Sequence, residues 1–116
     1  MIGRFVTGFG VFAFLVVSSS SAEAQSKDLS AKGRAIYEAQ KCSLCHSIEG
    51  KGQAKGPLDY VGDKLKADDI RKWLMDPTQA AKDHNATRKP AMKAYSNLPK
   101  EDLEALIAYM LSLKKK

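Results

Sequence analysis

Residues 42–46 form the pentapeptide Cys42-Ser43-Leu44-Cys45-His46, which contains the only two cysteines of the 116-residue chain. This C-x-x-C-H spacing is typical of covalent c-type haem attachment. Two thiols three residues apart lie on one side of a helical turn, so each can add to a vinyl group of the porphyrin. The imidazole of His46 would then face the iron, for which histidine is a common proximal ligand. The pentapeptide therefore predicts one covalently bound haem.

Three other sites that use paired cysteines fit the sequence less well. A thioredoxin-like C-x-x-C motif requires a βαβ context, and no strand pattern surrounds residues 42–46. A zinc site built from Cys42, Cys45, His46 and His84 would lack the spacing of zinc fingers, in which the histidines lie well away from the cysteines. A structural disulfide between the two cysteines would leave His46 unexplained.

The N-terminal residues predict export from the cytoplasm. A short positive segment, residues 1–4, precedes an apolar stretch from Phe5 to Val17, and a run of serines is followed by Ala22-Glu23-Ala24. This order is typical of a secretory signal peptide with an A-x-A cleavage site. The apolar stretch is shorter than the roughly 20 residues that span a bilayer, and an uncleaved anchor is the alternative. We expect residues 1–24 to be removed and the mature chain to lie in the periplasm.

Residues 25–116 are enough for one small domain, a single unit with no internal repeat. A chain of this length buries a modest core and gains stability from a cofactor. The formal net charge of +6 could suggest binding to nucleic acid, but export and the lack of interleaved aromatic residues argue against it. No transmembrane segment follows the signal peptide, so we expect no stable membrane insertion.

The pattern of apolar residues in the mature chain predicts an all-α fold with three to four helices around the haem, because no stretch alternates apolar and polar residues convincingly. A first helix is expected at about residues 29–41, capped by Asp28 or Ser30. A short helix is expected at about residues 67–75. Asp76-Pro77 should end it, because the residue before a proline avoids the helical region.

The last predicted helix is the clearest. Pro99 lies near its start, and acidic residues occupy its first turns, where the helix dipole favours negative charge. An amphipathic stripe follows, formed by Leu103, Leu106, Ile107, Met110, Leu111 and Leu113. Residues 47–62, which are rich in glycine, and residues 79–97, which are polar, are expected to form loops.

The iron needs a sixth ligand on the face opposite His46, and the candidates are Met75, Met92, Met110 and His84. Met110 lies on the apolar stripe, where core packing is the simpler interpretation. Met75 ends a short helix and is expected to pack or to face solvent. Met92 lies in a long loop that could fold over the haem, and its neutral thioether would stabilise ferrous iron. Met92 is therefore the preferred ligand, and His84 in the same loop is the main competitor.

The order of these features resembles a small soluble class I cytochrome c with a His/Met-ligated haem, over essentially the whole mature chain. Gly33 and Tyr37 resemble the small and aromatic positions on the N-terminal helix of that family. Leu106 and Tyr109 resemble their partners on the C-terminal helix. The resemblance implies that the two helices cross at these residues.

The same resemblance assigns further residues to the haem site. Gly56-Pro57-Leu58 resembles the Gly-Pro turn of the family, which implies that the carbonyl of Pro57 accepts a hydrogen bond from His46. Trp73 occupies the position of a tryptophan near a haem propionate, with plain core packing as the alternative. Residues 89–95 resemble the segment that bears the axial methionine, here Met92, although the proline often found directly after it is missing.

The resemblance implies a periplasmic monohaem electron carrier, not an enzyme, because two strong-field ligands leave no open coordination site. Its partners would be other redox proteins, which in this family dock their acidic surfaces on lysines around the haem edge, and the chain itself would be a monomer. The lysines that flank the predicted haem segments are Lys41, Lys51, Lys55, Lys89 and Lys93. A solvated surface that only aids solubility is an equally good interpretation of them.

Two other functional classes stay open at this point. A haem enzyme or gas sensor would require an open or labile distal position. A dedicated subunit of a larger oxidoreductase complex would carry electrons in the same way but would copurify with its partners.

The signal-peptide pattern predicts a mature protein that begins at Gln25. Its intact mass should equal that of residues 25–116 plus one haem, because cleavage follows Ala24 and the thioether bonds survive purification. Mass spectrometry of protein from the soluble periplasmic fraction tests this expectation. A product that retains residues 1–24 and sediments with the membranes would establish the uncleaved anchor instead.

Overall fold

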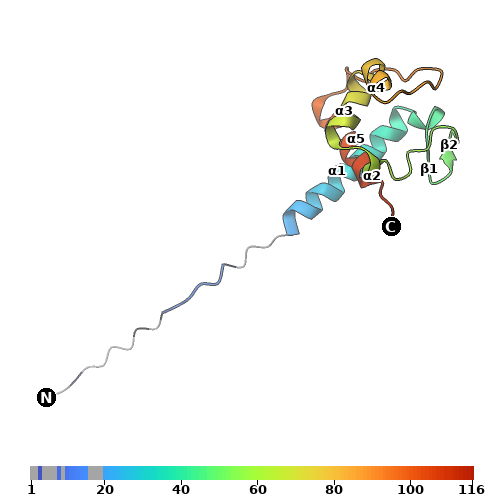
Figure 1. The fold of residues 1–116 in the computed structure, drawn as a ribbon. Coiled ribbons are helices and arrows are strands. Elements are labelled where there is room, and N and C mark those ends of the chain that lie inside the picture. Colours follow the sequence, from blue (N-terminus) through green and yellow to red (C-terminus); the bar gives the residue numbers. More distant parts are fainter. Residues whose placement is uncertain (1–2, 4–7, 9, 16–19) are drawn as a thin grey trace.

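The structure is a computed structural model, which describes residues 3, 8, 10–15 and 20–116 (Figure 1). Much of the predicted signal peptide, residues 1–2, 4–7, 9 and 16–19, lies outside the described residues. Within it, the side chains of Val11, Phe12, Phe14 and Leu15 are exposed. The cleavage site expected after Ala24 falls inside the first helix. Removal of the signal peptide therefore stays a prediction.

Five α-helices make up most of the described part of the chain. They are α1 (Ser20–Ala39), α2 (Val61–Lys64), α3 (Ala67–Met75), α4 (Pro77–Asp83) and α5 (Lys100–Ser112). A short 3-10 helix, η1 (Cys42–Leu44), follows α1. The strands β1 (Ser47–Ile48) and β2 (Lys51–Gly52) pair antiparallel, with Ser47 opposite Gly52. The predicted helical fold is confirmed. The number of helices exceeds the expected three to four because the short helices α2 and α4 were not predicted.

Helix α1 begins earlier than expected. The segment before Leu29 contains Ala24, Gln25 and Lys27, which favour helix, and no glycine or proline interrupts it. Asp28 and Ser30 were expected as caps but lie inside the helix. The first turns of α1 project beyond the other helices (Figure 1). At the other end Lys41 adopts a left-handed backbone conformation, with φ of 56°, which turns the chain into η1.

Helix α3 has the predicted bounds, but the loop expected from residue 79 begins as helix α4. Asp76 separates the two helices with a φ of −141°, and its carboxylate accepts a hydrogen bond from the N–H of Gln79 at 3.3 Å. Pro77 occupies the first turn of α4, where its fixed φ suits a helix and its missing N–H leaves no hydrogen bond unmade. The proline that ends one helix therefore starts the next.

The core forms where α5 packs against α1 and α3. Gly33 lies so close to α5 that a Cβ at this position would overlap the carbonyl oxygen of Ala105 and lie 2.7 Å from the Cβ of Tyr109. One turn further along α1, the ring of Tyr37 meets the edge of the Tyr109 ring, with centroids 5.8 Å apart and planes at 67°. This is the helix crossing that the resemblance implied. The buried cluster around it comprises Tyr37, Ile70, Leu74, Leu103, Leu106, Ile107 and Met110.

The segment between α4 and α5, residues 84–99, is here called the methionine loop. It is attached to the helical core by the N–H of Tyr95, which donates to the carbonyl of Leu74 at 2.7 Å. An ion pair between Arg71 and Glu104 joins α3 to α5. Among the helices of the described residues, none combines the length and hydrophobicity that a bilayer span requires.

A single methyl group added at Gly33 should destabilise the protein. Helix propensity alone would make Gly33→Ala stabilising by about 1 kcal/mol. The new Cβ, however, would overlap the backbone of Ala105, which no rotamer change can relieve. We expect this overpacking to lower the free energy of unfolding by about 1–3 kcal/mol, measured by urea denaturation of the holoprotein. Because the two effects have opposite signs, a gain in stability would show that the helices do not touch at this position.

Candidate functional site

The pentapeptide folds into a tight turn at the end of α1. The N–H groups of Cys45 and His46 both donate to the carbonyl of Cys42, at 3.1 and 2.9 Å. Cys42 is half-buried and Cys45 is exposed, and no disulfide joins them. Burial raises the pKa of the Cys42 thiol. Because no disulfide joins them, both thiols are free to form thioether bonds from one short turn.

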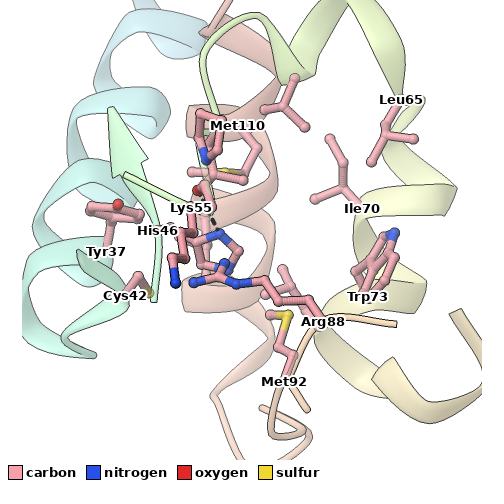
Figure 2. A pocket seen from close by; sticks show the side chains of 16 residues that line it. Tyr37, Cys42, His46, Lys55, Leu65, Ile70, Trp73, Arg88, Met92 and Met110 are labelled. Carbon is pink, nitrogen blue, oxygen red and sulfur yellow. Dashed lines mark hydrogen bonds between the residues drawn. The ribbon is translucent and has the colours of Figure 1, made fainter. Parts of the chain in front are cut away.

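The imidazole of His46 is oriented by the loop that follows it. Its Nδ1 lies 3.1 Å from the carbonyl oxygen of Gly56 (Figure 2), and because a carbonyl only accepts, Nδ1 carries the proton and Nε2 keeps a lone pair for a metal. Burial lowers the pKa of His46, and the positive charge of Arg88 lowers it further, while the Gly56 hydrogen bond opposes both. A neutral imidazole is the form that binds a metal ion.

The hydrogen-bond acceptor is Gly56 and not Pro57, so the assignment implied by the resemblance is corrected by one residue. The carbonyl of Gly56 also accepts from the N–H of Ser47 at 3.0 Å, and the N–H of Leu58 donates to the carbonyl of Ser47 at 2.8 Å. These bonds set the direction of the Gly56 carbonyl, which shares its oxygen between Ser47 and His46. Pro57 itself lines the cavity beside His46.

His46 faces a cavity of about 360 Å³ between the pentapeptide, α3, α5 and the methionine loop (Figure 2). Trp73 and Tyr37 line it. Most of its wall is aliphatic or thioether, from Leu58, Val61, Leu65, Ile70, Leu74, Leu106 and Met110. A second cavity of about 420 Å³ adjoins it on the side of Cys45, and the two share Cys42, His46, Arg88 and Met92.

Of the four candidate iron ligands, the structure brings two to the cavity. Met92, from the methionine loop, lines both cavities together with His46 and Arg88 (Figure 2). Met110 lines only the first cavity and is a core residue of α5, 6% exposed. Met75 is 40% exposed, and it lines neither cavity. His84 is exposed and also lines neither.

Trp73 lines the cavity from α3, and its position near a haem propionate stays a prediction. It lies on α3 between the buried side chains of Ile70 and Leu74, and it also lines the cavity. Its indole stacks on the imidazole of His84, with centroids 5.7 Å apart and planes at 28°. His84 is therefore explained by packing against Trp73 at the surface.

Two polar groups in the cavity were not foreseen from the sequence. Arg88 lines both cavities, although nothing in a loop sequence shows which side chain points inward. Tyr37 was assigned only to the helix crossing, yet its buried hydroxyl is without a hydrogen-bond partner among the described residues. The pKa of Tyr37 is raised to about 12, and burial of the hydroxyl is the largest cause. Of the five lysines singled out, Lys55 lines the first cavity, and Lys41 and Lys93 line the second.

The site suits a porphyrin. Two free thiols in one turn, a neutral imidazole and a thioether form the donor set of a covalently attached, six-coordinate haem. The apolar walls match a flat hydrocarbon ring, and the cavity volume falls within the range of cofactor sites. The cations Lys55 and Arg88 are suited to the carboxylates that such a ring carries.

Comparison with known proteins gives the family. The model of the cytochrome c family matches residues 30–114. Subunit 2 of cytochrome c oxidase from Alkalihalophilus pseudofirmus is 34% identical over 105 residues, which cover 83% of this chain but only 29% of that protein. No solved structure matches the chain. Because the matched residues include the pentapeptide, the cavity and the methionine loop, the chain belongs to the cytochrome c family and carries haem c covalently bound at Cys42 and Cys45.

Proposed function

We propose that this chain is a periplasmic monohaem electron carrier in which His46 and Met92 are the axial ligands. A cytochrome c domain transfers electrons and does not catalyse a reaction on a substrate. The observation that carries the finer proposal is that His46 and Met92 line the same cavity from two different loops. Bound haem supplies one-electron chemistry there, and the protein sets the conditions under which it operates.

The chain contributes ligand geometry and a dry environment. The Gly56 carbonyl fixes the tautomer of His46, so Nε2 keeps the lone pair that a metal needs. A thioether from Met92 would favour the ferrous state and would leave no open position for small molecules. The aliphatic walls from α3 and α5 keep water away, which strengthens every charge effect within the site. These features support reversible electron transfer with little rearrangement.

Export to the periplasm is supported by the sequence of residues 1–24, with its positive segment, apolar stretch and A-x-A pattern. The family supports the same compartment, because cytochrome c domains act outside the cytoplasm. We propose cleavage after Ala24, within the segment that forms the first turns of α1.

The surface over the second cavity is the side on which a redox partner would dock. Cys45 is exposed there and Leu44 is 72% exposed, while Lys41 and Lys93 line the cavity beside them. An apolar contact flanked by lysines suits a partner with an acidic rim, because complementary charge speeds association. Lys51 and Lys89 line neither cavity. They would attract a partner only through the overall electrostatic field of the protein.

A second candidate function is electron delivery within a terminal oxidase complex. The likeness to a cytochrome c oxidase subunit 2 favours it, although this chain spans only 29% of that protein. Purification under mild detergent distinguishes the two. Recovery of the cytochrome alone supports a free carrier, whereas recovery in a stoichiometric complex with oxidase subunits would support the second function.

The axial ligand is tested by Met92→Ala, with His84→Ala as the control. Loss of the thioether should abolish the weak methionine–iron(III) absorbance at the red end of the spectrum, lower the reduction potential and let carbon monoxide bind the ferrous form. His84→Ala should leave all three properties unchanged, because His84 lies outside both cavities.

Either of two results would contradict the ligand assignment. If His84→Ala had the effects expected of Met92→Ala, the haem would be bis-histidine. If neither variant altered the spectrum, Met110 would be the next candidate, because it also lines the first cavity. An open distal position in the unaltered protein would revive the enzyme or sensor hypothesis.

A further inference from the structure

The charged residues that line the two cavities are all positive. Lys55 and Arg88 line the first, and Lys41, Arg88 and Lys93 line the second. Not one Asp or Glu of the described chain is part of either lining. Within residues 20–116, Lys55 and Arg88 take part in none of the ion pairs. A cation beside apolar walls without a counter-charge indicates a site for an anion.

Arg88 is the cation with the most specific placement. Its backbone belongs to the methionine loop, four positions before Met92, and its side chain crosses the cavity to the loop after the pentapeptide. There it lies directly against Gly56, where a Cβ would overlap Nη1 of Arg88. The guanidinium thus spans the two loops that supply His46 and Met92 (Figure 2).

Arg88 lines the same cavity as His46 and Met92, so its guanidinium would have to leave part of that space when a porphyrin enters it. Arg88 is an exposed loop residue with a long, flexible side chain, so it can move toward the cavity rim without disturbing the core. It stays within reach of the cavity because its backbone does not need to move.

We propose that Arg88 binds a haem propionate and, by doing so, positions the methionine loop that carries Met92. The propionates are the anionic groups of haem, and the guanidinium matches a carboxylate in a bidentate way. Lys55, on the opposite loop, is the second cation available to the same carboxylate. The covalent bonds at Cys42 and Cys45 fix the ring to one loop, and the ion pair ties the other loop to the ring.

Arg88→Gln, Arg88→Lys and the matched control Lys89→Gln test this proposal, which rests on the haem site proposed above. Lys89 is the next residue in the same loop, carries the same charge and lines neither cavity. The measurement is the reduction potential of each purified holoprotein as a function of pH. A cation beside a carboxylate favours its ionised form, so its removal should move the propionate-linked step in the potential to higher pH.

We expect Arg88→Gln to shift that step upward and to lower the potential above it, because an unpaired carboxylate stabilises ferric iron. Arg88→Lys should shift the step less, since it keeps the charge but loses the bidentate geometry, and Lys89→Gln should not shift it. An unchanged profile in Arg88→Gln, or an equal shift in Lys89→Gln, would overturn the proposal. The methionine–iron(III) band of the unaltered protein reports the axial ligands separately, so failure of the Arg88 role and failure of the haem site are distinguishable.

Discussion

The close approach of α1 and α5 at Gly33 determines where the other parts of the haem site lie. Because the two backbones touch there, the direction of α1 is fixed relative to α5, and α1 delivers the pentapeptide directly beside the core. Met110 and Leu106 of the same α5 helix form one wall of the cavity. The attachment turn and the wall that it faces are therefore positioned by a single contact between two helices that lie far apart in the sequence.

Local chemistry made part of this site predictable. The C-x-x-C-H spacing and the apolar stripe of α5 are properties of short segments, and each specifies its own structure without reference to the rest of the chain. The crossing of Gly33 with Tyr109 is a long-range contact, and it was foreseen only because it resembles a known family. Pro77 shows the limit of local rules, since the same residue ends α3 and begins α4, and only the first role was expected.

The features of the haem site that could not be predicted from the sequence depend on how the loops run. The acceptor for His46 is the carbonyl of Gly56 and not that of Pro57 because hydrogen bonds with Ser47 set the direction of the peptide unit, and adjacent carbonyls point differently. Arg88 faces the cavity while Lys89 does not, although both are basic residues in one loop. A periodic pattern identifies the buried face of a helix, but no comparable period exists for a loop.

The attachment of Tyr95 to Leu74 has a consequence for how the protein moves. Residues 84–99 contain no helix or strand, and a main-chain hydrogen bond at Tyr95 joins them to α3. Segments with few buried contacts and little regular structure open locally at a lower free energy than the core that surrounds them. The fold therefore divides into a part that carries the covalent anchor and a loop that can open locally without global unfolding. With Met92 as the proposed axial ligand, the two ligands of one iron would then differ in lifetime.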